Sequence, residues 1–396
     1  MTHFSSYKLF FLLFLLSVTY SCTVDQQKNK TVPAVVRFAS YNVALYRSEA
    51  SQLAKDLSSG TDSQIQNVAA VIQHVRPDVI GLFEFDYDPS GQMLRSFQDN
   101  YLGKSQQGQS PLSYPYAIQI PSNTGIPSRV DYNGDGKVEL PNDAFGFGRY
   151  EGQYAFALLS KYPIDSAQIR TFQKLLWKQM PNHKTPINTD SSPYYSTAAW
   201  DNFRISSKNH ADIPIQLPNG QTIHTILAHP TPPVFDGPED RNGLRNYDEI
   251  RLLADYVNNA AYLVDDNGKR GGLNQTESFV IMGDLNADPV DGDSAPGAIQ
   301  QLLESKRLNP ATGMGDMIPA SLGGKAHNKA KEDEADPAFD TSFFGKRIDY
   351  VLPSADLNVI DAGVFWPGVD ESLYETVKDK NASDHLLVWA DFKVGE

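Results

Sequence analysis

Several short hydrophobic runs in this chain end in, or lead into, polar side chains that can carry acid–base or metal chemistry. Asn42 follows FASY, Glu84 ends VIGLFE and His229 follows TILA. Such runs are typical of buried strands, and loops at one edge of an α/β sheet gather distant residues into a shared crevice. We therefore expect one site built from strand ends. In chain order its residues are Asn42, Glu84, His229, Asp284, Asn286, Asp349, Asp384 and His385.

The residue types in this set favour metal-assisted hydrolysis. Glu84, Asp284 and Asp384 offer the hard oxygen ligands that Mg²⁺ or Mn²⁺ prefers, and Asn42 and Asn286 can coordinate or orient without adding charge. The two histidines add proton-transfer or phosphate-contact groups. Acyl transfer by a Ser-His-Asp triad is a weaker alternative because the sequence has no GxSxG nucleophile elbow.

The order of the motifs resembles a known family. The blocks SYN, LFE, AHP, GDLNAD, RIDYVL and SDH follow one another between about Arg37 and Phe392, as in the endonuclease/exonuclease/phosphatase superfamily. The resemblance implies a four-layer α/β sandwich, with two mixed β-sheets packed face to face and helices outside. It also implies metal-dependent hydrolysis of a phosphoester substrate.

The resemblance implies roles for individual residues. Glu84 resembles the principal metal ligand, with Asn42 and Asp384 near the ion. Asp284 and Asn286 resemble the pair that orients the attacking water and the phosphate.

The remaining roles fall to two histidines and an aspartate. His385 resembles the catalytic histidine of the SDH block, with Asp349 as its hydrogen-bonded partner, and His229 matches a second histidine that contacts the phosphate. A salt bridge from Asp349 to Arg347 is the competing interpretation. The blocks LFE and AHPTPP depart from the commoner LQE and THL forms, and the second departure leaves the substrate class open.

A separate motif predicts a calcium loop. DYNGDGKVELPND places oxygen side chains at Asp131, Asn133 and Asp135, followed by Gly136, which is the spacing of EF-hand loops. Position twelve is Asn142 instead of the bidentate glutamate. The hypothesis is a structural Ca²⁺ site, and the alternative is a hydrophilic turn.

Three arginines are candidates for phosphate binding. Arg149 lies between glycines, and Arg241 and Arg245 follow the His229 block four residues apart, which places them on one helix face. Ion pairing with neighbouring acidic residues is an equally weighted interpretation.

Charge limits the class of substrate. Acidic residues outnumber basic ones by 48 to 34, so the formal net charge is −14 and disfavours long nucleic acid. An extracellular nuclease, a sphingomyelinase-type lipid phosphodiesterase and a catalytically silent phosphate-binding module remain the alternatives to a general phosphoesterase. The oligomeric state is left open.

The N-terminus predicts export. The apolar run LFFLLFLL after Lys8 is typical of a signal peptide, predicted over residues 1–21. Cys22, the only cysteine, follows it and resembles the lipid-modified cysteine of bacterial lipoproteins, which would anchor the protein to a membrane at the cell envelope. An ordinary cleaved signal is the alternative and would give a periplasmic or secreted protein.

After a polar tether over 22–34, we expect one α/β domain over 35–396. Helical periodicity marks Gln64 to Val75 and Leu244 to Leu263. Long loop insertions are expected near 86–151 and 288–346, where Pro, Gly and Asp interrupt the strand pattern.

Overall fold

The computed structural model describes residues 1–3, 35–327 and 335–394. The account below concerns the compact unit Val32–Glu396. The predicted signal peptide, Cys22 and the tether fall in 4–34, outside the described residues except at the first three positions, and stay predictions. Among the described residues, none of the helices has the length and apolar character needed to cross a membrane.

The apolar runs of the sequence become strands. These are β1 (Val35–Leu45), β2 (Val79–Phe85), β3 (Tyr116–Ile120), β4 (Phe156–Ser160), β5 (Arg170–Thr171), β6 (His210–Gln216), β7 (Thr222–Ala228), β8 (Ser278–Asp284), β9 (Asp349–Pro353), β10 (Asn358–Phe365) and β11 (Leu387–Lys393). Within the described residues they form a six-stranded sheet, β10-β11-β1-β2-β4-β3, and a five-stranded sheet, β5-β6-β7-β8-β9. Both sheets mix parallel and antiparallel pairs.

Helices and short turns join the strands. The α-helices of the described residues are α1 (Gln52–Ser59), α2 (Ser63–Val75), α3 (Gln92–Phe97), α4 (Thr197–Asn202), α5 (Arg241–Val257), α6 (Gln300–Leu303), α7 (Leu322–His327) and α8 (Tyr374–Val377). The predicted helix Gln64–Val75 is confirmed as α2, with Asp62 capping its first turn through the amide of Ile65. The helix predicted from Leu244 begins earlier and ends earlier, as α5.

The two sheets pack face to face around one core. Buried side chains of the first sheet, such as Phe38 and Leu82, share a cluster with Leu227 and Met282 of the second. Gly81 marks a close approach between the sheets, because a Cβ there would lie 3.1 Å from Cδ2 of Leu227. Removing this apolar surface from water is the main force that joins the layers.

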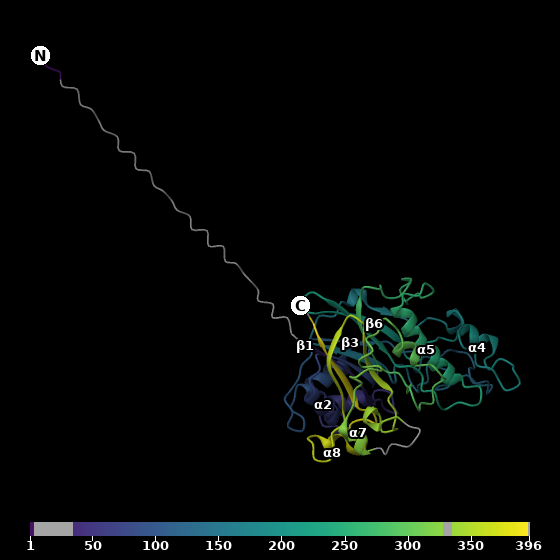
Figure 1. Cartoon of the computed structure of the whole chain (residues 1–396). Coiled ribbons are helices and arrows are strands. Elements are labelled where there is room, and N and C mark those ends of the chain that lie inside the picture. The colour runs from purple at the N-terminus through teal and green to yellow at the C-terminus, as the bar shows by residue number, and fades with distance from the viewer. Residues whose placement is uncertain (4–34, 328–334, 395–396) are drawn as a thin grey trace. The chain divides into compact units, whose positions relative to one another are not determined.

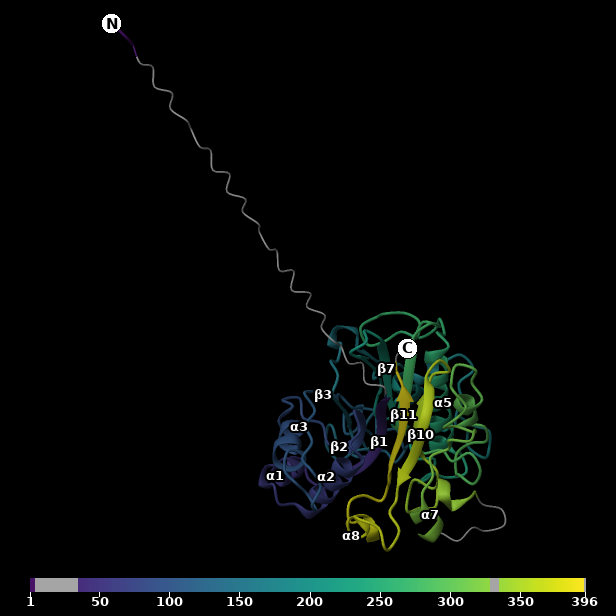
Figure 2. The same cartoon turned by 60° about the vertical axis from the view of Figure 1, so that its left-hand side comes forward.

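Helices cover the outer faces. Apolar residues of α2 belong to the core of the first sheet, whereas Ile250 and Leu253 of α5 pack with Phe279 and Ile281 of the second. Figure 2 shows α1, α2 and α3 on one side of the strands and α5 on the other, and Figure 1 shows the same layers from another side. The predicted four-layer α/β sandwich is confirmed.

The strand directions bring the predicted site residues to one edge. β1 runs parallel to β2, and β7 parallel to β8, so their carboxyl ends meet. β9 and β11 run antiparallel to β8 and β1, so their first residues lie at that same edge. The register places Asp284, the last residue of β8, directly opposite Asp349, the first residue of β9.

Candidate active site

Two of the site residues lie where the backbone departs from regular strand geometry. The register between β1 and β2 shifts after Asn42, and Glu84 within this bulge has φ of 58°. Asn286, just after β8, has φ of 51°. Left-handed conformations cost energy in residues that carry a Cβ, and they concentrate at functional sites. The bulge therefore aims the Glu84 side chain where a regular strand would not.

Close packing requires a glycine at the start of the GDLN block, Gly283. A Cβ on Gly283 would lie 2.2 Å from the carbonyl oxygen of Ala228. This contact holds the end of β8 against the end of β7. It thereby sets Asp284 beside His229, the residue that follows Ala228.

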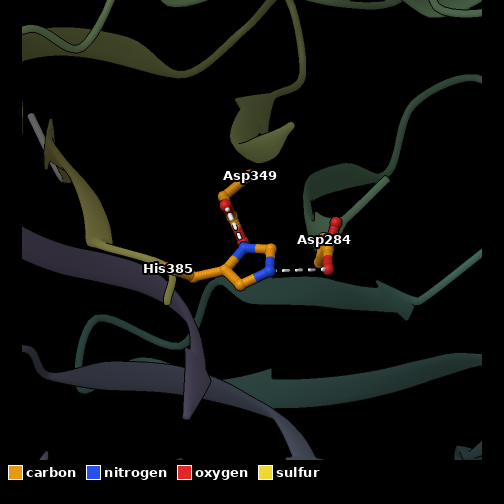
Figure 3. Close-up of side chains that lie close together, drawn as sticks. All are labelled: Asp284, Asp349 and His385. Carbon is orange, nitrogen blue, oxygen red and sulfur yellow. Dashed lines mark hydrogen bonds and ion pairs between the residues drawn. The ribbon is translucent and has the colours of Figure 1, made fainter. Parts of the chain in front are cut away.

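His385 lies between two buried carboxylates, as Figure 3 shows. Its Nδ1 is 2.9 Å from Oδ2 of Asp349, and its Nε2 is 3.7 Å from Oδ2 of Asp284. The competing contact of Asp349 with Arg347 is not formed; the guanidinium of Arg347 donates instead to the carbonyls of Gly313 and Thr312. The partnership of Asp349 with His385 implied by the resemblance is therefore present in the structure.

A hydroxyl group fixes the carboxylate of Asp349. Oγ1 of Thr341 accepts the backbone amides of Ile348 and Asp349, each at 3.0 Å, so its own hydrogen is directed to Oδ2 of Asp349 at 2.9 Å. The other carboxylate oxygen of Asp349 is buried and has no hydrogen-bond partner among the described residues. The His385 ring is thus oriented by a carboxylate that is itself held in place.

One oxygen of Asp284 is shared by three nitrogen atoms. Oδ2 accepts Nδ2 of Asn42 at 3.0 Å and lies 3.4 Å from Nε2 of His229, in addition to its contact with His385. The other oxygen, Oδ1, accepts the backbone amide of Asn286 at 3.1 Å. Asp284 is therefore the point at which the strand ends meet.

The two histidines differ in charge. Although burial favours a neutral ring, the carboxylates of Asp349 and Asp284 raise the pKa of His385, so it is charged at neutral pH. Burial, together with the cations of Lys208 and His385, lowers the pKa of His229 well below its ordinary value. A pair of titratable groups pushed apart in this way is typical of an acid–base site.

The contacts of His229 define its proton position. Its Nε2 faces the carboxylates of Asp284 and Glu84, the latter at 4.0 Å, whereas its Nδ1 is buried with no partner in the described part of the chain. A neutral ring with the proton on Nε2 satisfies these contacts. Phe83, at the departure from the usual LQE block, packs edge-on against this ring with centroids 6.2 Å apart.

The carboxylates fit a divalent cation. Burial raises the pKa of Glu84 to about 7, with Asp284 and Asp384 acting in the same direction against His385 and Lys208. Within the described residues the Glu84 carboxylate, whose side chain is 20% exposed, makes no hydrogen bond, so it faces the like charges of Asp284 and Asp384 without a donor. A second group, Asp284, Asp349 and His385, has ligand atoms within 4.8 Å of one another and is also consistent with a divalent metal. The identity of an ion follows from neither group.

Sequence reasoning missed Lys208. This lysine precedes β6 and is 7% exposed, and its Nζ lies 3.4 Å from the carbonyl oxygen of Pro230, which also accepts Nδ2 of Asn286 at 3.2 Å. Burial lowers the pKa of Lys208, while Glu249, Glu84 and Asp284 oppose that shift. The surrounding sequence SSKNH reads as an exposed turn, so no motif marked this residue.

Glu249 does not neutralise Lys208 by direct pairing. Its carboxylate accepts the amide and hydroxyl of Ser207 at 2.6 and 2.9 Å, and the amide of Thr231 at 2.6 Å. Among the described residues no carboxylate lies within 4.0 Å of Nζ of Lys208. Its ammonium group therefore keeps donors available to a ligand of the site.

Two of the three candidate phosphate-binding arginines, Arg241 and Arg245, are engaged in contacts within the protein. Arg241 pairs with Glu239, and Arg245 is buried and donates to the carbonyls of Ile205, Phe145 and Arg204. Arg149 is exposed. Burial raises the pKa of the Tyr154 hydroxyl, and the positive charge of Arg149 opposes that shift. The ion-pair interpretation describes the contacts of Arg241, and a phosphate-binding role for the three stays a prediction.

The predicted calcium loop is an exposed turn. Asp131 accepts the backbone amides of Gly134 and Gly136, and Asn133 donates to Asp135. These are the contacts of Asx turns, and they leave the calcium hypothesis a prediction.

Comparison with known proteins identifies the family. A sequence model described as Endonuclease/Exonuclease/phosphatase family matches residues 39–385. No curated protein matches the chain. Members of the family are mostly metal-dependent phosphoesterases.

Several solved structures are similar to the chain at low identity. An endonuclease/exonuclease/phosphatase from Beutenbergia cavernae is 14% identical, with 91% of this chain and 72% of that one covered and a TM-score of 0.49. A mannosyl-6-phosphatase from Bacteroides thetaiotaomicron is 13% identical over 90% and 99%, with a TM-score of 0.45. Beta toxin from Staphylococcus aureus is 16% identical over 90% and 99%, with a TM-score of 0.44. From the extent of the sequence-model match, the chain belongs to the endonuclease/exonuclease/phosphatase family.

Proposed function

We propose that the protein is a divalent-metal-dependent phosphoesterase that hydrolyses its substrate by attack of a water molecule. The observation that carries this proposal is the arrangement around Asp284. Its carboxylate meets a charged His385, a neutral His229 and the amide of Asn42 within 3.7 Å. A phosphate-binding module has no need of a buried carboxylate held beside an oriented, charged imidazole.

The charged His385 acts as a hydrogen-bond and proton donor in this arrangement. Asp349 holds its Nδ1, which leaves Nε2 directed toward Asp284 and the site. Asp284 is the carboxylate that accepts a hydrogen from the attacking water. Positioning of this kind lowers the barrier because the groups need not reorganise as the reaction proceeds.

Donors on the opposite side hold the phosphate. His229 offers its Nε2 hydrogen, and Asn286 and Lys208, which both donate to the Pro230 carbonyl, have further hydrogens on Nδ2 and Nζ. A neutral donor, an amide and a cation together fit a phosphate that carries one or two negative charges.

We place the metal at Glu84, with Asn42 and Asp384 beside it. When bound, a divalent cation there neutralises charge on the non-bridging oxygens of the phosphate. Support comes from the Glu84 carboxylate, which faces Asp284 and Asp384 without a hydrogen-bond donor in the described residues. The competing position is the group Asp284, Asp349 and His385.

Turnover of a substrate panel tests the function. The panel contains an aryl phosphate monoester, a bis-aryl phosphodiester, plasmid DNA and sphingomyelin, each with Mg²⁺, Mn²⁺, Ca²⁺ or EDTA. His385→Ala is compared with the control His74→Ala, which removes an exposed histidine of α2. We expect metal-dependent turnover that His385→Ala loses and His74→Ala keeps. The preferred substrate separates a nuclease or a sphingomyelinase from other phosphoesterases.

Two outcomes would contradict the proposal. Turnover that survives EDTA treatment excludes a metal-dependent reaction. Phosphate binding without turnover of any panel member indicates the silent binding module.

The metal position has its own test. Mn²⁺ binding is measured by calorimetry in Glu84→Gln and in Asp349→Asn. We expect the first variant to lose most of the affinity and the second to keep it. The reverse result would place the ion at Asp349 and His385.

We also propose that the protein is exported and anchored through a lipid on Cys22. The support is the sequence alone, an apolar run followed by a single cysteine. Fractionation of cells expressing the wild type and Cys22→Ser, with a labelled fatty acid, tests it. Label and membrane association that both depend on Cys22 are expected, and equal soluble export of the two proteins would contradict the anchor.

A further inference from the structure

A short turn beside the active site is held by contacts with catalytic residues. Residues 341–343 lie along the segment that carries His385: the amide of Phe343 donates to the carbonyl of Asp384 at 2.9 Å, and the amide of Leu386 donates to the carbonyl of Thr341 at 2.7 Å. Ser342 forms a bridge with His385 itself. The turn thus has a fixed position relative to the imidazole.

The tip of the turn is closed and ordered by its own hydrogen bonds. The amide of Thr341 donates to the carbonyl of Lys346 at 3.0 Å, and that of Gly345 donates to Ser342 at 3.2 Å. Gly345 has φ of 72°, which only glycine adopts at little cost. Lys346 also donates through Nζ to the carbonyl of Asp291.

Two adjacent phenylalanines of this turn point in different directions. Phe343 packs against Trp366 at a centroid distance of 4.9 Å and contacts the main core. Phe344 is 54% exposed, and its ring meets that of His385 edge-on at 5.7 Å. The turn therefore holds an exposed apolar ring in a fixed position beside the imidazole, where it can contact a bound substrate.

A lysine side chain contacts the exposed ring of Phe344. Nζ of Lys380 lies 5.0 Å from the centroid of Phe344, within the range of a cation–π contact. Lys380 is itself exposed and has φ of 63°. The ammonium group lies over one face of the ring, so an exposed apolar ring and a positive charge lie together next to the group that reacts with the phosphate.

We infer that Phe344 and Lys380 form a subsite for a ring carried by the substrate. This inference rests on the proposed phosphoesterase function and narrows its substrate to phosphoesters that bear a flat-faced ring, either a sugar or an aromatic group. The ring of the substrate packs on the face of Phe344 that Lys380 does not cover, while its phosphate lies between His385 and His229. Apolar C–H faces of sugars and aromatic rings share this mode of packing.

The test compares ring-bearing with ring-free esters. A hexose 6-phosphate and an aryl phosphate are measured beside glycerol 3-phosphate, and a corresponding set of diesters is measured in parallel. The variants are Phe344→Ala, Phe344→Leu and Phe344→Tyr, with Val369→Ala as a control at another exposed apolar residue. Each kcat/KM is expressed relative to the wild type, so differences in leaving-group reactivity cancel.

We expect Phe344→Ala to lower the ratio of ring-bearing to ring-free kcat/KM by about 10-fold. Phe344→Tyr keeps the wild-type ratio. Phe344→Leu lowers the ratio, because leucine supplies apolar bulk without a flat face. Lys380→Met lowers the same ratio by about 2- to 5-fold. The hexose and aryl arms show which kind of ring the subsite takes.

An equal effect of Phe344→Ala on all the esters would overturn the inference. If the wild type turns over none of them, the proposed function fails, and calorimetric binding of the same esters decides the subsite separately. Binding of the ring-bearing and ring-free esters that Phe344→Ala weakens to the same extent would overturn it as well.

Discussion

Replacing Asp349 with asparagine tests whether His385 works as a charged donor. The carboxylate lies 2.9 Å from Nδ1 of His385, and both side chains are almost fully buried. Thr341 still donates to the oxygen of an asparagine, so the geometry is kept while the negative charge is lost. We expect the pKa of His385 to fall from its raised value toward that of an ordinary imidazole.

The size of the effect follows from the distance. An opposite charge within 4 to 6 Å shifts a pKa by about 1 to 3 units, each of which is a factor of ten in the population of the charged form. A raised pKa means that charged His385 is present below that pKa and lost as the pH rises through it. The alkaline limb of kcat/KM should therefore move to lower pH by about 1 to 3 units in Asp349→Asn.

The assay is the pH dependence of kcat/KM, together with an NMR titration of the His385 ring in the metal-free protein. Asp391→Asn serves as the control because it also removes a carboxylate, one paired with Arg37 at 2.7 Å, but outside the site. The control should leave the limb in place. An unshifted limb in Asp349→Asn, with kcat lowered equally at every pH, would refute the reasoning and leave Asp349 only an orienting role.

Three further predictions follow from buried charges. Because burial raises the pKa of Glu84 to about 7, its carboxyl binds a proton below that pH, and the affinity for Mn²⁺ should fall about tenfold per pH unit there. Calorimetry of the wild type across this pH range measures the dependence, and a constant affinity would contradict the prediction. Lys208→Met should weaken competitive inhibition by inorganic phosphate by about 10- to 100-fold, since a hydrogen bond between phosphate and a charged group is lost. Lys208→Arg should recover part of the inhibition, and equal inhibition of the wild type and both variants would exclude a contact of Lys208 with phosphate. Asp265→Ala removes one partner of a buried ion pair with Arg170 at 2.7 Å and should lower the free energy of unfolding in urea by about 3 kcal/mol, with a change under 1 kcal/mol counting against it.

Much of the fold follows from local patterns in the sequence. The apolar runs that end in polar residues become β1, β2, β7 and β8, because a strand buried on both faces must be apolar along its length. The period of α2 and the proline after it define that helix for a similarly local reason. The order of the six motifs then indicates the family.

Other strands depend on their neighbours. β3, β6 and β10 are not marked by apolar runs: β6 contains Pro214, and β10 contains Asp361 and Gly363. β3 and β10 lie at the edges of the first sheet, whereas β6 lies between β7 and the short β5. Each forms because a neighbouring strand offers unpaired backbone groups at its edge, which stabilises segments of modest strand propensity. The sequence alone does not show that such an edge is available.

The sequence by itself determined the family and the set of candidate residues, since side-chain type and motif order are local properties. Only the tertiary structure decided which of them are charged and which residues they contact. His385 and His229 are the same residue type, yet one gains a proton and the other loses it because their burial and neighbouring charges differ. Lys208 and Phe344 enter the site only through folding, since their partners Pro230 and His385 lie far away along the chain.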